Sequence, residues 1–460
     1  MDIKRRNLLR FAGLGAAATA AGIAPTLTRV GAVEAAPVVR KVVVIGGGFG
    51  GSTVAKYLKL WGQAQVEVTH VSLASTYVSP ILSNLVLNGQ KSLASLTFNL
   101  QTAATKLGIR FVAGSAAIDR GARLVRVTHD NGTETLLDYD KVVLSPGIAF
   151  NTLPSMLAAN RGIAGGKLPI PHAWQAGPQV GNLKAQIDRM PSSSGVFVLC
   201  IPKAPYRCPP GPYERACVVA DILKRVKRGG RVVIFDANAP TNPADKYTAI
   251  QAEQHTFSTA FTGAYGSIVE YVPNATLLEV GTTGGQFGTK TARVRLGDGS
   301  VRTQTCNVLN VLPEHKAGAI AFAADLIPVG QRFVPVDQQS YASLADPDIH
   351  VIGDAHDSKQ PKAGHVANSE AKVCADAIVR EFGILPPRTA EEVPVTNSAC
   401  YSPISSTTAS WLTVGFRYDP VSRQMVRIDA SLAEAEQPSG DNYKMMLAWA
   451  NNLFADTFSV

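Results

Sequence analysis

A cysteine stands in an unusual proline-rich turn before a predicted helix. Residues 207–217 read Arg-Cys-Pro-Pro-Gly-Pro-Tyr-Glu-Arg-Ala-Cys, so Cys208 precedes three prolines and a glycine. Proline is tolerated in the first helical turn, where backbone amides have no intrahelical partner. The positive end of a helix, together with Arg207 and Arg215, favours the thiolate, which is the reactive form of a cysteine. Cys208 is therefore a candidate redox residue, and the alternative is an ordinary buried thiol in a strand-to-helix turn.

The helix predicted after this turn has one apolar face and a basic end. Its apolar positions are Ala216, Val219, Ala220, Leu223 and Val226. Lysine and arginine fill most of 224–228, where the helix macrodipole favours cations. This pattern predicts an amphipathic helix that begins close to Cys208.

Length and charge limit the classes of function. A chain of 460 residues is too long for one hydrophobic core and predicts about two or three domains. The formal net charge is +9, and it falls to +6 without residues 1–35, which carry five basic and two acidic side chains. No long Lys/Arg run with interleaved aromatic residues remains, so nucleic acid is not an expected partner.

The first 35 residues have the pattern of an export signal. Lys4-Arg5-Arg6 is followed by a weakly apolar stretch over 11–24 and by small residues that end at Ala35. This is a twin-arginine pattern, and it predicts export to the periplasm of a protein already folded around a cofactor. The alternative is an uncleaved anchor, but the apolar stretch is short and weak for a membrane span. We expect no integral membrane segment after the signal is removed.

Cysteine spacing excludes some cofactors from this chain. The cysteines are at positions 200, 208, 217, 306, 374 and 400. They form no C-x-x-C pair and no haem-attachment motif, so a c-type haem is expected only on another chain. No His/Cys/acid cluster has metal-ligand spacing, and no metal is expected.

A glycine motif follows the first predicted strand. Residues 40–45 are a continuous apolar, β-branched run of the kind found in buried parallel strands, and Gly46, Gly48 and Gly51 follow it. A helix to about residue 60 and a second strand over 66–71 complete the unit. Glycines in this context allow a tight turn and bring a helix N-terminus to a pyrophosphate, which predicts dinucleotide binding. Ser72 stands where an acidic residue is expected for the ribose hydroxyls.

Two later strand ends favour FAD over NAD as the dinucleotide. One strand ends at Pro146 and Gly147, and another ends at Gly353 and Asp354, whose carboxylate could reach the ribityl or phosphate region. Residues 361–369 then lead to a helix predicted over 370–381, and they include the candidate cofactor-binding residues Lys362 and Asn368. Amides at this helix start could face the flavin pyrimidine edge, although an ordinary capped helix start explains the same residues.

These units predict an α/β fold with two Rossmann-like domains. The FAD domain is discontinuous, over 38–160 and 302–388, and a second Rossmann-like domain covers 161–301. Bulky residues and prolines over 200–208 stand where a nicotinamide site needs glycines, so NAD(P)H is disfavoured as a partner. A smaller C-terminal α+β domain covers 389–460 and ends in an amphipathic stretch over 443–458.

The motifs together resemble the flavoprotein subunit of flavocytochrome c sulfide dehydrogenase. The resemblance runs from about residue 38 to the C-terminus and rests on five segments. These are 207–216, Pro171-His172-Ala173-Trp174, 352–355, Cys400-Tyr401-Ser402, and Trp449 with Asn451-Asn452. It implies the fold of glutathione reductase, with a split FAD domain, a second Rossmann-like domain and a C-terminal domain.

The resemblance also implies a mechanism and roles for particular residues. Cys208 and Cys400 match the two cysteines of a redox disulfide beside the flavin. Glu214 matches an acidic residue near that disulfide, although a first-turn helix carboxylate is an equally simple interpretation. Trp449 matches a tryptophan near the haem subunit, with simple packing as the alternative. Sulfide would be oxidised at the disulfide, and FAD would pass the electrons to a c-type cytochrome.

One position departs from the family pattern. Pro80 stands where the family carries the cysteine that bonds covalently to the flavin, so FAD is expected to be non-covalent. Two alternative functions remain. A membrane-docked sulfide or thiol:quinone oxidoreductase would need an exposed apolar face on the last helix. A non-catalytic accessory subunit would have weakened FAD binding.

Overall fold

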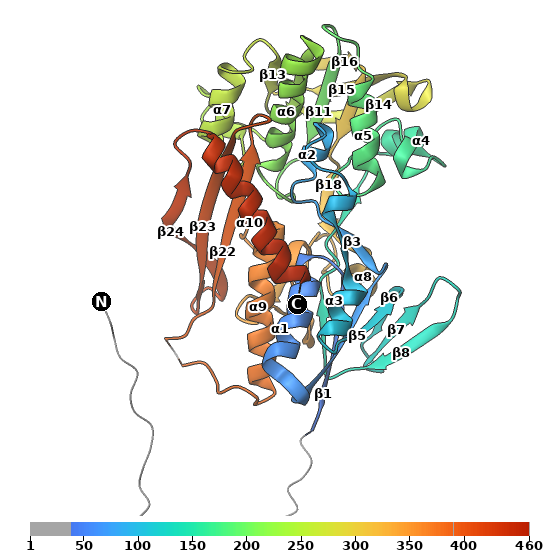
Figure 1. Ribbon diagram of the computed structural model, residues 1–460, viewed down its shortest axis with the longest axis vertical. Helices are drawn as coiled ribbons and strands as arrows, with labels where there is room; N and C mark the ends of the chain where they lie inside the picture. Colours follow the sequence, from blue (N-terminus) through green and yellow to red (C-terminus); the bar gives the residue numbers. More distant parts are fainter. Residues whose placement is uncertain (1–37, 390, 460) are drawn as a thin grey trace, which may run out of the picture. The chain divides into compact units, whose positions relative to one another are not determined.

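A computed structural model of the protein describes residues 38–389 and 391–459 (Figure 1). The predicted export signal lies outside the described residues. Strands from both ends of the chain share one seven-stranded sheet, whose last five strands are parallel. Its order is β19 (Val336–Asp337), β20 (Ala342–Ser343), β21 (Asp346–Val351), β9 (Lys141–Leu144), β1 (Arg40–Ile45), β2 (Val66–Ser72) and β5 (Arg110–Ala113).

Two helices pack together against this sheet. Helix α1 (Phe49–Gly62) follows β1, and α9 (Gly364–Glu381) follows β21, so the two segments lie side by side although they are far apart in sequence (Figure 1). Val54 and Leu58 of α1 and Ala371 and Ile378 of α9 are all fully buried in the core that includes β1. The burial of these side chains holds the glycine turn against the end of β21.

A second, four-stranded parallel sheet forms the centre of the middle segment. Its order is β13 (Val269–Val272), β12 (Arg231–Asp236), β11 (Val196–Ile201) and β17 (Val308–Val311). Both faces are covered, which suits its continuous apolar strands. Val198 and Cys200 of β11 pack in a core with β14 (Thr276–Thr283), β15 (Thr289–Arg295) and β16 (Val301–Cys306). The opposite face of β11 packs with the helices α5 (Pro178–Asp188), α6 (Gly211–Ile222) and α7 (Gln254–Thr262).

The helix after the cysteine turn is buried on all sides. Every residue of α6 from Gly211 to Ile222 is buried, and a π-helical turn over Leu223–Lys227 follows. Val226, expected on the apolar face, is 62 % exposed. The prediction of an amphipathic helix was therefore wrong, because α6 contacts the parallel sheet, α7 and the C-terminal sheet at once.

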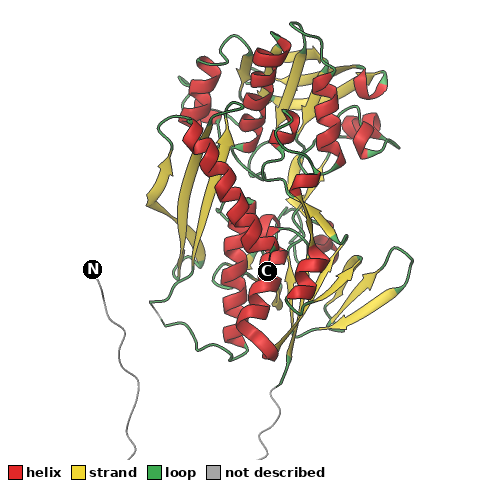
Figure 2. Cartoon of the chain, viewed as in Figure 1, coloured by secondary structure: helices red, strands yellow, loops and turns green. Residues whose placement is uncertain are grey.

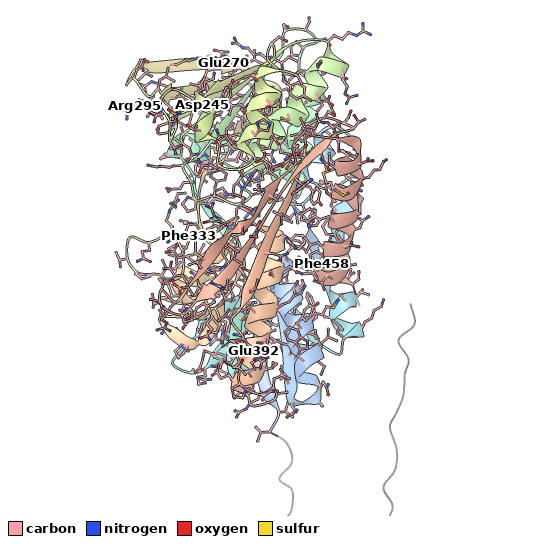
Figure 3. The ribbon with its side chains drawn as sticks, turned by 90° about the vertical axis from the view of Figure 1, so that its left-hand side faces the viewer. Asp245, Glu270, Arg295, Phe333, Glu392 and Phe458 are labelled. Atoms are coloured by element: carbon pink, nitrogen blue, oxygen red, sulfur yellow. The ribbon has the colours of Figure 1, made fainter. Side chains whose placement is uncertain are left out.

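The C-terminal segment is an antiparallel sheet with one long helix (Figure 2). Its strands are β22 (Val395–Pro403), β23 (Ala409–Asp419) and β24 (Gln424–Glu434), followed by α10 (Gly440–Phe458). Ser439 caps α10 by accepting a hydrogen bond from the Asn442 amide. Strand β22 contacts both α6 and α9, and Figure 3 shows this sheet running from the middle segment, where Glu270 is labelled, toward Glu392.

Smaller elements connect these parts. None of the helices in the described ranges is both long and apolar enough to cross a membrane. The remaining strands are β3 (Thr76–Val78), β4 (Thr97–Asn99), β6 (Ser115–Asp119), β7 (Leu124–Thr128), β8 (Glu134–Asp138), β10 (Ile148–Asn151) and β18 (Glu314–Ala317). The remaining helices are α2 (Asn84–Leu87), α3 (Leu100–Lys106), α4 (Pro154–Asn160) and α8 (Ala319–Ala323).

Candidate functional site

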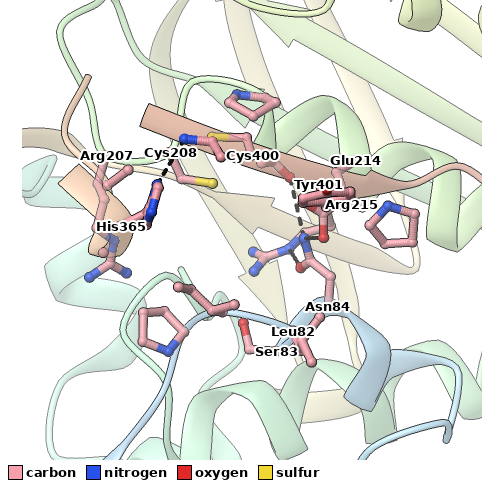
Figure 4. Close-up of a pocket in the computed structure, with 18 of the residues that line it drawn as sticks. Leu82, Ser83, Asn84, Arg207, Cys208, Glu214, Arg215, His365, Cys400 and Tyr401 are labelled. Atoms are coloured by element: carbon pink, nitrogen blue, oxygen red, sulfur yellow. Dashed lines mark hydrogen bonds between the residues drawn. The ribbon is translucent and has the colours of Figure 1, made fainter. Parts of the chain in front are cut away.

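One cavity brings together the residues predicted from separate segments. Cys208, Cys400 and Glu214 all line it (Figure 4). Trp449 and Pro80 line it too. Both thiols are free in this structure, so the two cysteines share a cavity without a bond between them. The cavity is therefore the place where chemistry that needs both sulfurs could occur.

The turn that carries Cys208 is tightly held. Cys208 has φ +59°, a left-handed conformation that is uncommon for a residue other than glycine. Its amide donates to the Lys362 carbonyl at 2.7 Å, and its carbonyl accepts from the Gly211 amide at 2.9 Å. A Cβ at Gly211 would lie 2.8 Å from the Cys208 sulfur, so only glycine allows α6 to begin so close to this side chain.

The electrostatics of Cys208 differ from the prediction. The pKa of the Cys208 thiol is raised to about 12, mainly by burial and in part by the Glu214 carboxylate. Arg207 and the Gly211 amide lower this pKa, but their effect is smaller. The prediction of a favoured thiolate was therefore wrong for the free thiol in this cavity, because desolvation outweighs the nearby cation and the helix start.

Cys400 lies in β22, opposite Leu412 of β23. Burial raises the pKa of its thiol well above the usual value, and a charge on Cys208 raises it again. The amide of the preceding Ala399 donates to Nδ1 of His365 at 2.9 Å. The strand thus presents Cys400 to the cavity next to a histidine whose ring position is fixed by the same strand.

Glu214 is held by a buried network that includes Arg215. Asn84 donates to Glu214 Oε1 at 2.9 Å and accepts from Arg215 Nε at 2.9 Å. Burial raises the pKa of Glu214 to about 7, with Asn84 and Arg215 lowering it in part. A carboxyl group with such a pKa exchanges protons near neutral pH.

Arg215 has an anchoring role. Its guanidinium donates to the carbonyls of His172 and Ala173 and to Asn310 Oδ1 at 2.7–3.1 Å, and it lies 4.7 Å from the Trp174 ring. It therefore holds the segment that contains His172 and Trp174 against α6. Arg207 is the cation whose charge lowers the pKa of Cys208.

Trp449 packs within the cavity wall. Its ring lies 5.3 Å from Tyr401 and 5.8 Å from His365. Its Nε1 is buried and has no hydrogen-bond partner in the part of the chain that the structure describes. The tryptophan on α10 therefore contacts the strand that carries Cys400 and the start of α9, where His365 lies.

The glycine motif has the geometry of a dinucleotide turn. A Cβ at Gly46 would lie 2.1 Å from the Ser145 carbonyl oxygen, and one at Gly51 would lie 1.8 Å from the Gly46 carbonyl oxygen. Gly48 directly precedes α1, whose first turn has no side-chain cap, and a Cβ at Gly48 would lie 3.5 Å from the Tyr77 ring. Unpaired amides at a helix start suit a phosphate. Ser72 ends β2, and its Oγ would lie 2.6 Å from a Cβ at Gly47.

The second strand end carries an unpartnered carboxylate. Asp354 Oδ1 is buried and has no hydrogen-bond partner within the described ranges. Burial raises the pKa of Asp354, and the charges of Arg207 and Lys362 lower it. Gly353 has φ +73°, and its amide donates to Glu370 at 2.7 Å. An orphaned acceptor next to a glycine turn fits a group that brings its own hydroxyl donors, as the ribityl chain of FAD does.

The other predicted cofactor residues have varied surroundings. Gly147, which directly follows Pro146, has φ +65°. Its carbonyl accepts a hydrogen bond from the Gly318 amide. Lys362 is buried, donates to the His356 carbonyl at 2.6 Å and lies 3.9 Å from the Phe333 ring. Its charge still lowers the pKa of Asp354, so it contributes to the electrostatics of that end of the site.

Asn368 connects three helices through its side chain. Its side-chain amide donates to Thr53, Asp456 and Thr457 at 2.8–3.1 Å, so it ties α9 to α1 and α10. Its role in cofactor binding stays a prediction. The helix start itself, at Gly364, remains adjacent to the cavity.

Sequence reasoning missed several residues of the site. Asn84, His365 and Tyr401 line the cavity. Only Tyr401 lies in a segment that carries the resemblance, and none of the three was predicted to be a site residue. No spacing rule links Asn84 to Glu214, because the contact depends on α2 packing against α6. Over the described residues, no group of His, Cys, Asp and Glu side chains is arranged to hold a metal ion.

Two family models match the chain. Residues 181–313 match the central part of the flavoprotein chain of sulfide dehydrogenase (flavocytochrome c), and residues 40–167 match pyridine nucleotide-disulphide oxidoreductase. The resemblance predicted from sequence is confirmed by these matches. They support a flavin cofactor and an oxidoreductase related to sulfide dehydrogenase.

Solved structures share the fold. The sulfide:quinone oxidoreductase of Aquifex aeolicus has a TM-score of 0.70 at 15 % identity, with 91 % of each chain covered. The NAD-dependent persulfide reductase of A. fulgidus has a TM-score of 0.55 at 15 % identity, covering 90 % of this chain and 77 % of its own. Reduced CoADR-RHD of Bacillus anthracis has a TM-score of 0.55 at 16 % identity, covering 91 % and 75 %. The predicted α/β fold class with two Rossmann-like domains is thereby confirmed.

Proposed function

We propose that this chain oxidises sulfide at a redox pair formed by Cys208 and Cys400 and passes the electrons, through bound FAD, to a c-type cytochrome in the periplasm. The observation that carries the proposal is that both cysteines line one cavity together with Glu214. The match of residues 181–313 to the flavoprotein chain of sulfide dehydrogenase supports the same reaction.

The first step is a thiol–disulfide exchange. Hydrosulfide attacks one sulfur of the oxidised pair, the bond between Cys208 and Cys400 breaks, and a persulfide forms on the attacked cysteine. The electron pair of the broken bond remains on the other cysteine as a thiolate. Both cysteine side chains are buried enough to raise their pKa values, so a thiolate formed here is a strongly reducing group.

Glu214 is placed to manage the proton. Its carboxyl group lines the cavity, and its pKa is raised to about 7, so both protonation states are populated near neutral pH. It can take the proton of hydrogen sulfide or of the persulfide. Asn84 keeps one carboxyl oxygen in place during this exchange.

The residues that would hold FAD are the turn at Gly46–Gly51, with Ser72, and the strand end at Gly353–Asp354. When bound, FAD supplies a two-electron acceptor that can release electrons singly. Pro80 lines the cavity at the position where the resembling family has its flavin-linking cysteine, which supports non-covalent binding. Arg207 lowers the pKa values of both Cys208 and Asp354, so its charge acts on the cysteine cavity and the proposed cofactor site together.

The electron acceptor is inferred from the family. Flavocytochrome c pairs the flavoprotein chain with a cytochrome, and the twin-arginine pattern of residues 1–35 supports a periplasmic location. Trp449 lines the cavity from α10 and is the proposed residue on the side of the cytochrome. The quinone-reducing alternative needs an exposed apolar face on α10, but Met446, Ala450, Leu453, Phe454 and Phe458 of this helix are buried.

The test is sulfide-dependent bleaching of the flavin absorption in the holoprotein. Replacing Cys208 or Cys400 with serine should abolish bleaching, whereas Cys374→Ser, a buried thiol in α9, should leave it unchanged. Full turnover in either of the first two variants would reject the proposal. A purified protein with no flavin absorption would instead favour the accessory role.

A further inference from the structure

Another buried carboxyl group, that of Glu253, does not line the cavity and has no part in the steps above. Glu253 is 2 % exposed and precedes α7 with φ +51°. A left-handed conformation is unfavourable for glutamate, and it persists only where the surroundings hold the residue in place. The structure therefore fixes an ionisable group at a position where its burial is costly.

Glu253 is bonded to the strand that carries Cys400. The Ser402 hydroxyl donates to Glu253 Oε2 at 2.5 Å. Ser402 is two residues after Cys400 in β22, so both side chains lie on the same face of the strand. The other carboxyl oxygen, Oε1, is buried with no partner among the described residues. One oxygen is thus free to receive or release a proton.

A row of hydroxyl groups leads from Glu253 toward solvent. Ser402 and Ser410 are cross-strand partners in β22 and β23, so Ser410 lies beside the serine that donates to Glu253. Ser410 and Thr256 hydroxyls are 3.0 Å apart, and Thr256 donates to Glu434 Oε1 at 2.9 Å. Ser402 and Ser410 are fully buried, whereas Glu434 is half-buried. The hydroxyls form a path from a buried carboxyl group to one that reaches the surface.

The inner end of this path is bonded to a strand that lines the cavity, because Ser402 donates to Glu253 and lies two residues after Cys400. A charge on Glu214 raises the pKa of Glu253, and a charge on Glu253 raises the pKa of both Cys208 and Cys400. The titratable groups coupled to Glu253 by charge are Glu214 and Cys217 from α6, Cys208 before it, Cys400 from β22 and Glu434 from β24. All of these are acidic or thiol groups, so Glu253 has several groups in its surroundings that can exchange protons.

We propose that Glu253 is a proton-transfer residue that moves the proton released by sulfide oxidation from Glu214 to Glu434. The inference rests on the proposed function. Hydrosulfide attack forms one S–S bond, breaks another and leaves two electrons on the released thiolate. The persulfide retains the proton of the hydrosulfide. Glu214 accepts this proton, Glu253 receives it from Glu214, and the Ser410 and Thr256 hydroxyls pass a proton on to Glu434.

The test compares Glu253→Gln with Glu436→Gln in the holoprotein. Glutamine keeps the size of the side chain but cannot carry a proton, and Glu436 is an exposed residue two positions after Glu434. We expect steady-state turnover of E253Q to fall at least about 10-fold, with persulfide formation on the cysteines still detected by mass spectrometry. Formate, a small diffusible acid, should restore part of the E253Q rate. Wild-type turnover and pH profile in E253Q would overturn the proposal.

A second variant covers the case in which E253Q does not fold. Glu434→Gln changes the outer end of the path, where the side chain is half-buried, and should lower turnover in the same direction with formate rescue. Unchanged turnover in E434Q would then overturn the path. If the wild-type protein itself forms no persulfide with sulfide, the proposed function fails, and that result is distinct from a failure of the relay alone.

Discussion

Cys208 and Cys400 line one cavity, although the first precedes α6 in the middle of the chain and the second lies in β22 near its end. The contact between β22 and α6 brings the two segments together. Since the cysteines come from different structural units, anything that shifts the start of α6 should change the reactivity of the pair.

Gly211 is the residue that most tightly limits where the Cys208 side chain can lie. In Gly211→Ala the added Cβ would lie 2.8 Å from both the Cys208 sulfur and the Trp174 ring, so Cys208 must move. We expect a loss of about 1–3 kcal/mol in the free energy of unfolding and at least a 10-fold fall in sulfide-dependent flavin reduction. Stopped-flow spectroscopy and thermal unfolding measure the two effects.

Gly181→Ala is the matched control. It also lies in a helix, α5, but its nearest neighbour for a new Cβ is Leu93 at 3.9 Å. This variant should have wild-type reduction rates. Equal rates in G211A and wild type would show that the close contact at Cys208 does not matter for the reaction.

Asp354 offers a test of the cofactor site. Its buried, unpartnered oxygen should lower the stability of the flavin-free protein and should bind the flavin when it is present. Asp354→Asn should therefore raise the melting temperature of the flavin-free protein at pH 7. The same change should weaken flavin binding about 10- to 100-fold, since hydrogen bonds to a charged group are worth about 1.5–3 kcal/mol. Flavin titration followed by fluorescence measures this affinity.

Asp357→Asn controls for general effects of removing a negative charge, because Asp357 is exposed three residues along the same segment. It should leave both the melting temperature and the flavin affinity unchanged. A D354N protein with wild-type flavin affinity would remove Asp354 from the cofactor site.

The linkage between flavin and protein can be tested directly. Acid precipitation of the wild-type holoprotein should release all flavin into the supernatant, because Pro80 cannot form a thioether. In Pro80→Cys, a fraction of the flavin should stay with the precipitate, and absorption of the two fractions gives the ratio. Flavin retained by the wild-type protein would contradict non-covalent binding.

Buried Glu253 predicts a pH dependence of stability. Burial raises the pKa of Glu253 from 4.5 to about 8, so between these values the native protein holds a proton that the unfolded chain has lost. The free energy of unfolding therefore falls as pH rises through this range. Glu253→Gln removes this pH dependence. The stability of E253Q relative to wild type should therefore be higher at pH 8.5 than at pH 5.

Thermal unfolding at both pH values measures the difference, and one displaced pKa unit corresponds to about 1.36 kcal/mol. Glu436→Gln should show no such change between the two values. A constant difference between E253Q and wild type across the range would mean that Glu253 has an ordinary pKa in the folded protein.

Much of the fold could be predicted from the sequence because the patterns of single strands, turns and helices were strong. The β-branched run of β1 and the glycines after it set a strand, a turn and a helix with little dependence on the rest of the chain. The burial of α6 could not be predicted in this way. Its apolar face suggested an amphipathic helix, but tertiary contacts bury every side of it, and a single-element pattern does not contain that information.

Part of the site could be predicted from the sequence. Proline and glycine around Cys208 marked an unusual turn, but its pairing with Cys400 came only through the resemblance to a family, since β22 and α6 meet through tertiary packing. Local sequence suggested a stabilised thiolate at Cys208, yet the depth of burial that raises its pKa is a property of the assembled cavity. Glu253 had no motif at all, and its importance follows from Ser402 and the cross-strand Ser410.

The central claim is that Cys208 and Cys400 form a redox pair, and a non-reducing peptide map of the oxidised protein tests it most directly. After alkylation of free thiols and digestion, mass spectrometry should find the peptides with residues 208 and 400 joined by a disulfide. Addition of sulfide before alkylation should replace this bond with a persulfide on one cysteine and an alkylated thiol on the other. Two freely alkylated cysteines in the oxidised protein, unchanged by sulfide, would contradict the account.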